Sequence, residues 1–320
     1  MPISTYPAMA LTGAKVIEIV RDPRAQVEAQ QALRERYASP FLLSAMDLSA
    51  EAEAFGCSIS FSDSEVPTVT GRLVTSAEQA QRLVVPGPGA GRTGVFLETV
   101  RDLRHMDPHA FVFGGCIGPF SLAARLVGVS ESMELTMTEP ALMHTLLDKS
   151  SEFLLGYIQG FRAAGASGVI MAEPAAGLLS PRAMAAFSSA YIRRIAGEVN
   201  GEGFTLLLHN CAAKLLHLPA IRETGLNAFH FGAPMDVVSA LGQVPQDVVL
   251  CGNLDPAGLF VQSAPDAVYA RTAGLLKETS EHRNFVVSSG CDLPPNATLP
   301  ALDAFYAAAK EAPVVLNPRV

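Results

Sequence analysis

The segment VIMAEPAAGLLSPRAMAAFSSAYIRRIAGEVNGEGFTLLLHNC, residues 169–211, contains a complete strand–helix–strand pattern. Its two outer runs, VIMAE and TLLLH, are short and apolar on both faces, as strands buried inside a parallel sheet are. Between them, Ser180 and Pro181 predict a helix start, because Ser caps a helix and Pro fits its first turn. The segment therefore predicts two parallel strands joined by a crossover helix.

The same alternation recurs along the chain. Further strand-like runs occupy residues 41–47, 111–117, 228–232, 248–252 and 285–290. Repeated strand–helix units without a Pro/Gly-rich linker predict an α/β fold, a (β/α)8 TIM barrel that forms a single domain over residues 1–320. Its eighth strand is expected at residues 58–62 or in an irregular N-terminal part, where residues 1–40 form a helical extension.

The composition excludes several classes of protein. Hydrophobic residues make up 49% of the 320 residues and charged residues only 17%, which is enough apolar material for a sizeable core. The net charge is -8 and there is no basic run, so nucleic acid is not an expected partner. No apolar stretch reaches the roughly 18 residues that a membrane span needs, and the first residues do not resemble a secretion signal. The five scattered cysteines suit a reducing compartment, so we expect a cytoplasmic protein with no membrane partner.

Polar and sulfur-containing side chains follow three of the predicted strands. Glu173 ends one, His209 and Cys211 end the next, and Cys291 with Asp292 follows the last. The carboxyl ends of barrel strands line the active site, and side chains two apart in an extended segment share a face. A His, two Cys and a carboxylate match the ligands that Zn²⁺ prefers, and thiolates select it over Mg²⁺ or Ca²⁺. The sequence therefore predicts zinc held by His209, Cys211, Cys291 and Glu173.

Other conspicuous residues are expected to be structural. Cys57, Cys116 and Cys251 have the character of small buried hydrophobic residues. The glycine-rich run PGPGAGRTG, residues 86–94, follows no strong strand, so a surface loop is predicted there rather than a dinucleotide-binding loop. His230, within AFHFG, is expected to face either the barrel interior, where it would touch substrate, or an outer helix.

Several motifs resemble the uroporphyrinogen decarboxylase superfamily. From about Asp47 to the C-terminus, they are MDLSAEAEAFG, VPTV, FGGCIGPFSLAARLVG, VIMAEPAAGLLSP, LLLHNCA, VVLCGNLDP and SSGCDLPPNATLPALDAF. The H-x-C element with the later G-C resembles the branch of zinc-dependent, corrinoid-linked methyltransferases, such as methylcobamide:coenzyme M methyltransferase. The R-Q-A-G-R segment of the true decarboxylases is missing from the corresponding region, RERYASPFLLSAMDLSAEAEAFG.

This resemblance implies a (β/α)8 enzyme that moves a methyl group from a methylated corrinoid, carried by a corrinoid protein, to a small-molecule acceptor such as the thiol of coenzyme M. We expect the acceptor thiol to take the fourth zinc position and displace Glu173, because a metal-bound thiol is deprotonated and can attack the methyl carbon. The substrate-binding or supporting residues expected around this site are Asp47, Asn210, His230, Asn253, Asp255 and Asp292.

Three alternatives remain open at this point. The protein could be a decarboxylase of a tetrapyrrole, a non-catalytic corrinoid-binding or chaperone module, or an enzyme that demethylates a small methylated donor. The methyl acceptor, whether coenzyme M, another thiol or tetrahydrofolate, does not follow from the sequence.

Overall fold

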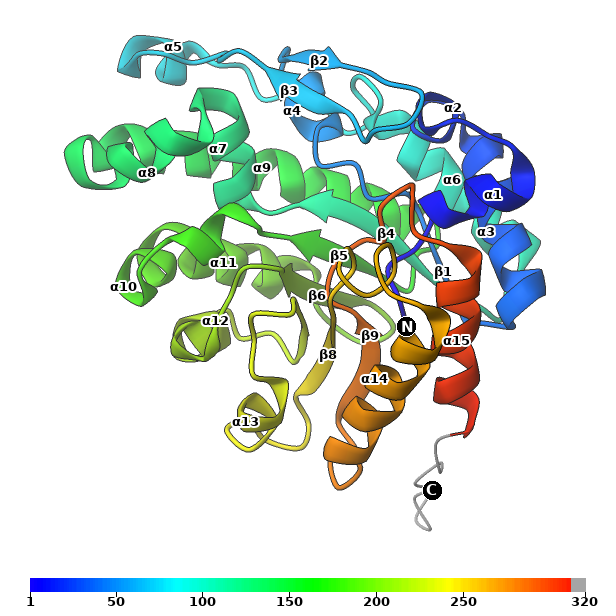
Figure 1. Cartoon of the computed structure of the whole chain (residues 1–320). Coiled ribbons are helices and arrows are strands. Elements are labelled where there is room, and N and C mark those ends of the chain that lie inside the picture. Colours follow the sequence, from blue (N-terminus) through cyan, green and yellow to red (C-terminus); the bar gives the residue numbers. More distant parts are fainter. Residues whose placement is uncertain (312–320) are drawn as a thin grey trace.

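Seven parallel strands form one curled sheet in the computed structural model, which describes residues 1–311 (Figure 1). In spatial order they are β1 (Phe41–Leu43), β4 (Phe111–Ile117), β5 (Gly168–Ala172), β6 (Thr205–Asn210), β7 (Ala228–Phe231), β8 (Val249–Leu254) and β9 (Phe285–Ser289). Each neighbouring pair is parallel. Every strand-like run of the sequence is one of these strands, which confirms the α/β class.

Helices join the strands and cover the outer face of the sheet (Figure 1). Those before β4 are α1 (Met9–Thr12), α2 (Val16–Ile19), α3 (Pro23–Tyr37), α4 (Ala50–Ala54), α5 (Ala77–Arg82) and α6 (Thr93–Met106). Those after β4 are α7 (Pro119–Val127), α8 (Val129–Thr138), α9 (Pro140–Ala163), α10 (Pro181–Met184), α11 (Ala190–Val199), α12 (Leu218–Arg222), α13 (Val237–Leu241), α14 (Pro265–Glu278) and α15 (Leu299–Glu311). Ser180 caps α10 by accepting from the Ala183 amide at 3.3 Å, as predicted. None of the described helices is long and apolar enough to cross a membrane.

Residues 1–311 supply seven strands to the sheet, so the α/β fold is confirmed and a closed barrel of eight strands is not. The candidate eighth strand becomes β2 (Ser58–Ser60), which pairs antiparallel with β3 (Thr68–Thr70) in a separate hairpin. Its residues are exposed or half-buried, whereas a strand inside the sheet would be covered on both faces. The seven strands are therefore not closed into a ring by a strand ladder.

The N-terminal segment occupies the gap between the two edge strands, β9 and β1. On the β9 side, Ile3 forms a parallel bridge with Asp292, and its amide donates to the Ser289 hydroxyl at 3.1 Å. On the β1 side, Gln30 of α3 donates to the Ser4 carbonyl at 2.9 Å and accepts from the Leu43 amide at 3.3 Å. A side-chain amide thus replaces the missing backbone ladder, so these edge groups keep hydrogen-bond partners.

Two apolar cores lie on the two faces of the curled sheet. The inner core contains Ile3, Leu43, Met46, Phe113, Ile170, Ala172, Leu207, Ala228 and Cys251. These come from the N-terminal segment, from β1 and the segment after it, and from β4 through β8, so distant strands of the sheet share one interior. In the outer core, the rings of Tyr157 and Phe161, both on α9, pack against each other in a tilted arrangement with centroids 4.6 Å apart. Gly114 of β4 permits this packing, because a Cβ there would lie 2.5 Å from the Phe161 ring.

The glycine-rich run is a loop over residues 86–92, as predicted, and its last two residues begin α6, but the loop carries a buried cation. The Arg92 side chain is 8% exposed and forms ion pairs with Asp47, which is fully buried, and with Glu53 of α4. It also donates to the Ser49 hydroxyl at 2.9 Å. Because an unpaired buried carboxylate is costly, the ion pair with Arg92 offsets the cost of burying Asp47.

We expect Arg92→Ala to lower the free energy of unfolding by about 3–5 kcal/mol, because it leaves Asp47 buried without its cation. Denaturant titration of the variant and of the wild-type protein measures this difference. Arg82→Ala is the matched control, since Arg82 pairs with Glu78 on the exposed face of α5, and it should change stability little. Equal effects of the two substitutions would show that the buried ion pair does not stabilise the fold.

Candidate metal centre

His209, Cys211 and Cys291 lie together at the carboxyl ends of two strands. His209 is the penultimate residue of β6, Cys211 follows that strand directly, and Cys291 lies just beyond β9. The ligand atoms of the three side chains all lie within 4.8 Å of one another, close enough to hold one metal ion. His209 is buried and both cysteines are half-buried. The structure thus brings together the H-x-C pair and the distant cysteine that the sequence singled out.

The two thiols interact directly. A hydrogen bond between the two side chains lowers the pKa of Cys211 and raises the pKa of Cys291, and burial raises the pKa of Cys291 further. The contact between the two sulfurs therefore shifts their pKa values in opposite directions. Cys57, Cys116 and Cys251 are buried and do not join this group, in agreement with their expected structural role.

The two ring nitrogens of His209 have different surroundings. Nδ1 lies 2.8 Å from Nδ1 of His230 and 3.3 Å from the His230 carbonyl oxygen. Nε2 is buried and has no hydrogen-bond partner among residues 1–311. His230 is fully buried behind His209, and its Nε2 lies 2.8 Å from the Ser288 hydroxyl. Burial lowers the pKa of His230, so its ring is neutral and suited to orienting His209.

Glu173 is not part of the group formed by the three candidate ligands, and its Oε2 is buried without a hydrogen-bond partner among the described residues. Its carboxylate Oε1 accepts from the Ser121 amide at 2.7 Å, in the first turn of α7. Burial raises the pKa of Glu173 to about 8, against the hydrogen bonds from Ser121 that lower it. Its backbone amide donates to the His209 carbonyl at 2.8 Å, so Glu173 ties the end of β5 to the end of β6.

Three predicted pocket residues hold the backbone of the surrounding loops. Asn210 accepts from the Ala212 amide at 3.2 Å and so shapes the turn that carries Cys211. Asn253 donates to the carbonyls of Gly232 at 3.2 Å and Met235 at 2.6 Å. Asp255 is exposed and accepts from two amides of the following turn at 3.0 Å. Their contact with a substrate stays a prediction.

The two remaining predicted residues are acidic and have opposite environments. Asp47 is paired with Arg92, as described above. Asp292, next to Cys291, has a buried Oδ1 without a hydrogen-bond partner among the described residues, and burial raises its pKa well above the usual value. Tyr6 lies near both, since both carboxyl groups add to the rise of its pKa that burial causes. Asp292 therefore carries an unused polar atom beside the candidate centre.

Glycines make room where the site loops meet. A Cβ on Gly232, just after β7, would fall on the carbonyl oxygen of Cys211. A Cβ on Gly290, just before Cys291, would lie 2.9 Å from the Ala233 amide nitrogen. A side chain at Gly232 or at Gly290 would therefore shift the backbone of the loops that carry Cys211 and Cys291.

Glu51 of α4 is a buried polar residue that the sequence did not single out. It is 1% exposed, accepts from the Ile117 amide at 2.9 Å, and leaves Oε2 without a partner among residues 1–311. Its pKa is raised to about 8, mainly by burial and to a smaller extent by the nearby Asp47, while backbone hydrogen bonds oppose the rise. Nothing in AEAEA signals this, because alternating Glu and Ala is typical of a solvent-exposed helix.

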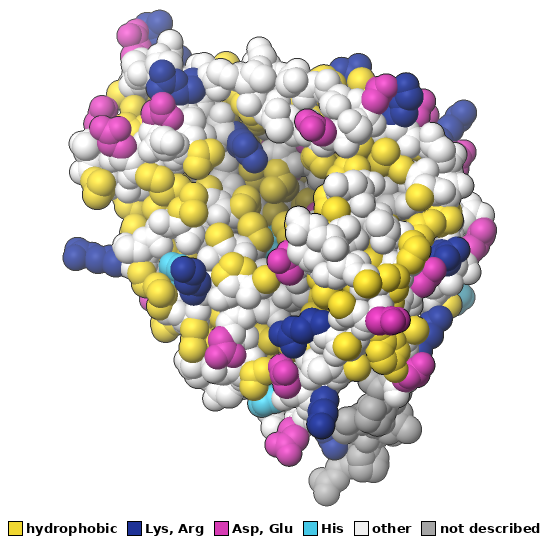
Figure 2. Space-filling view, in the orientation of Figure 1, with side chains coloured by type: hydrophobic (Ala, Val, Ile, Leu, Met, Phe, Trp, Pro, Cys, Tyr) yellow, Lys and Arg dark blue, Asp and Glu magenta, His cyan; other side chains and the backbone are white. Residues whose placement is uncertain are grey.

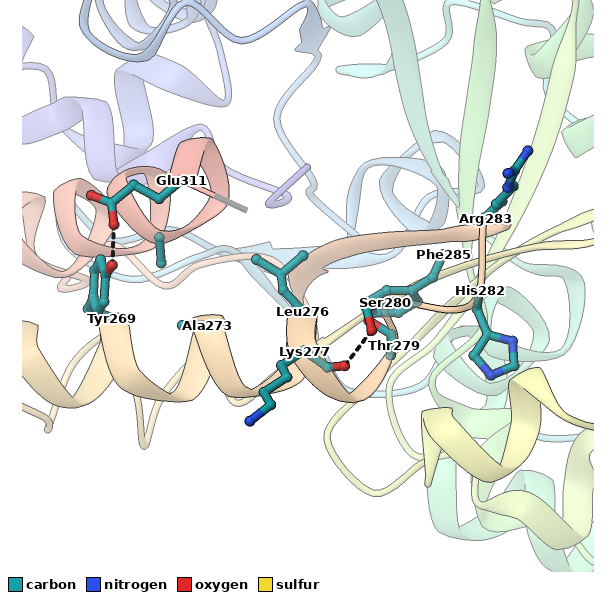
Figure 3. A pocket seen from close by; sticks show the side chains of 11 residues that line it. Tyr269, Ala273, Leu276, Lys277, Thr279, Ser280, His282, Arg283, Phe285 and Glu311 are labelled. Carbon is teal, nitrogen blue, oxygen red and sulfur yellow. Dashed lines mark hydrogen bonds between the residues drawn. The ribbon is translucent and has the colours of Figure 1, made fainter. Parts of the chain in front are cut away.

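The molecular surface is hollowed in several places. Figure 2 shows a hollow in one face, with hydrophobic side chains on its floor. A separate cavity of about 580 Å³ lies between α14, α15 and the start of β9, where Figure 3 shows Tyr269 hydrogen-bonded to Glu311. Its wall includes Phe285, the first residue of β9, whereas Cys291 lies beyond the last residue of that strand. This cavity is therefore at the other end of β9 from the candidate centre.

Comparison with known proteins identifies related sequences. A family model described as uroporphyrinogen decarboxylase matches residues 4–312. The chain is 28% identical over 275 residues to methylated-thiol–coenzyme M methyltransferase of Methanosarcina mazei, covering 84% of this chain and 71% of the relative. It is 26% identical over 290 residues to methylcobamide:CoM methyltransferase of the same organism, covering 86% and 85%. It is 29% identical over 271 residues to uroporphyrinogen decarboxylase of Psychromonas ingrahamii, covering 79% and 75%.

A solved structure, a methyltransferase from Methanosarcina mazei, has the same fold with a TM-score of 0.87. It is 23% identical, and the match covers 97% of this chain and 91% of that one. The superfamily resemblance read from the motifs is confirmed, and methyltransferases and decarboxylases both occur among the relatives.

The buried Glu51 predicts a pH dependence of stability. Its pKa is about 8 in the folded protein and 4.5 ordinarily, so between these values the folded state binds the additional proton and loses stability as pH rises. Glu51→Gln removes this proton while keeping an acceptor for Ile117. The variant should therefore gain stability relative to wild type as pH is raised across that interval, measured as the difference in melting temperature. Glu78→Gln on the exposed α5 is the control, and a pH-independent difference for Glu51→Gln would contradict the expectation.

Proposed function

Because the chain belongs to the uroporphyrinogen decarboxylase family, we propose that it is a methyltransferase that passes a methyl group from a methylated corrinoid to a thiol at a zinc ion. The proposed zinc ligands are His209, Cys211 and Cys291. The observation that carries the proposal is the meeting of one imidazole and two thiols within 4.8 Å at strand ends. Decarboxylation of a tetrapyrrole has no use for such a donor set.

The donors present fit a zinc ion. Nε2 of His209 is buried without a partner among the described residues, which is costly unless something binds it. The hydrogen bond with Cys291 lowers the pKa of Cys211, which favours the thiolate that a metal ion binds. Zn²⁺ favours nitrogen and sulfur ligands in four-coordinate geometry, and three protein ligands leave one position for substrate.

A bound zinc ion would keep the acceptor thiol deprotonated at neutral pH. The thiolates of Cys211 and Cys291 would balance the charge of the ion, so that the acceptor sulfur remains electron-rich. Burial of His209 closes the imidazole side, whereas the half-buried cysteines leave the sulfur side accessible. The acceptor is therefore expected to approach past the two cysteines.

The proposed methyl donor is a methylated corrinoid presented by a corrinoid protein. The name of the methylcobamide:CoM methyltransferase relative supports this donor class. The acceptor sulfur would attack the methyl carbon, and the cobalt–carbon bond would break with its electron pair remaining on cobalt. The products are a thioether and the reduced corrinoid. Coenzyme M is the first acceptor to test, followed by other thiols and tetrahydrofolate.

Glu173 has a different role in this proposal from the one expected from the sequence. With its carboxylate bound at α7 and its amide bound to the His209 carbonyl, it would position the ends of β5 and β6. The fourth zinc position is then free for the acceptor without displacement of a carboxylate.

Purified protein should bind about one Zn²⁺ per chain through two sulfurs and one nitrogen. X-ray absorption should show Zn–S distances of about 2.3 Å. Cys291→Ala should lose the metal but keep its circular dichroism spectrum, because Cys291 lies outside the strands. Cys57→Ala is the matched control and should retain zinc, since Cys57 is not part of the group. Full zinc occupancy in Cys291→Ala would contradict the assigned ligands.

Zinc-loaded protein should demethylate methylcobalamin in the presence of a suitable thiol. The absorbance change of methylcobalamin, followed anaerobically, measures this reaction for each acceptor. A chelator should abolish the transfer and added Zn²⁺ should restore it, because the thiol is ionised only on the metal. If zinc-loaded protein leaves methylcobalamin unchanged with every thiol and with tetrahydrofolate, a non-catalytic corrinoid-binding role becomes the better explanation.

A further inference from the structure

We propose that His230 and Ser288 form a hydrogen-bonded chain that holds the proton of His209 on Nδ1 and leaves Nε2 free to bind metal. The inference rests on the proposed zinc site. It assigns His230 and Ser288 as positioning residues, since neither belongs to the group of candidate ligands.

At the His209 end of the hydrogen-bonded chain, a backbone carbonyl determines which atom donates and which accepts. Nδ1 of His209 lies 3.3 Å from the carbonyl oxygen of His230 and 2.8 Å from Nδ1 of the same residue. A carbonyl oxygen only accepts hydrogen bonds, so Nδ1 of His209 carries the hydrogen. In a neutral imidazole the other nitrogen then has the lone pair. That nitrogen, Nε2, is the buried atom without a partner among residues 1–311.

At the Ser288 end, a second backbone carbonyl leads to the same order of donors and acceptors. The Ser288 hydroxyl donates to the carbonyl oxygen of Met1, which uses its only hydrogen. The Ser288 oxygen, 2.8 Å from Nε2 of His230, must therefore accept from that nitrogen. With its hydrogen on Nε2, His230 has its lone pair on Nδ1 and accepts from His209. Two independent carbonyls thus lead to one arrangement of protons.

The hydrogen-bonded chain of His209, His230 and Ser288 is isolated from water. His230 and Ser288 are both 0% exposed, and His209 is 3% exposed. Their strands also fix them, because His209 and His230 are opposite each other in the β6–β7 ladder. Since no solvent can replace a lost partner at this depth, a change in the chain should reach the metal-binding nitrogen directly. Partners of this kind typically change metal affinity by about 10–100-fold when removed.

The two ring nitrogens can be examined without metal. Histidine labelled with ¹⁵N in metal-free protein, at a pH above the usual imidazole pKa of about 6.5, reports which nitrogen carries hydrogen. Subtraction of the His209→Gln spectrum identifies the His209 signals among those of the seven histidines. We expect hydrogen on Nδ1 and none on Nε2. Hydrogen on Nε2 of His209 in the wild-type protein would overturn the proposal, whatever the variants do.

The contribution of the chain to metal binding is tested by two variants of similar size. His230→Leu removes the acceptor for His209 and should weaken zinc affinity by about 10–100-fold in a chelator competition. His230→Asn keeps an acceptor oxygen and should restore most of that loss. Zinc affinity of His230→Leu equal to that of wild type would overturn the proposal, and melting curves identify a variant that does not fold. If wild type itself binds no zinc, the proposed function fails, while the ¹⁵N spectrum still decides the proton arrangement.

Discussion

The curl of the parallel sheet is the constraint on which the candidate centre depends. β6 and β9 are separated by β7 and β8, so in a flat sheet they would lie about 14 Å apart at the usual strand spacing. The ligand atoms of His209 and Cys291 nevertheless lie within 4.8 Å. Only a curled sheet, with both strand ends turned toward a common axis, brings them into contact. The inner core that spans the sheet from Ile3 to Cys251 maintains this curvature.

The N-terminal segment connects this curvature to the chemistry of the site. It lies along β9 through Ile3, reaches β1 through Gln30, and accepts a hydrogen bond from Ser288 at the Met1 carbonyl. The same few residues that occupy the gap in the sheet therefore end the hydrogen-bonded chain behind His209. Closure of the interior and orientation of the candidate ligand are two consequences of one set of contacts.

The buried acidic side chains around this interior differ in whether they have a cationic partner. Asp47 has a cation, because Arg92 reaches it from the glycine-rich loop. Glu51 and Glu173 have backbone amides but no ion pair among the described residues, and burial raises the pKa of each to about 8. A backbone amide offsets only part of the cost of burying a carboxylate, so these two are protonated at neutral pH.

Local patterns in the sequence were sufficient to predict the positions of the seven strands, the helix cap at Ser180 and the proximity of His209 to Cys211. Apolar periodicity and two-residue spacing depend only on the backbone near each residue. The tertiary structure alone decided the number of strands in the sheet and the hydrogen-bond partners of Glu173 and His230. Oε1 of Glu173 accepts a hydrogen bond from the Ser121 amide of α7, and His230 lies beside His209 of β6 and Ser288 of β9. A polar side chain binds whichever partner the distant parts of the fold bring within reach, and the local sequence does not indicate which partner that is.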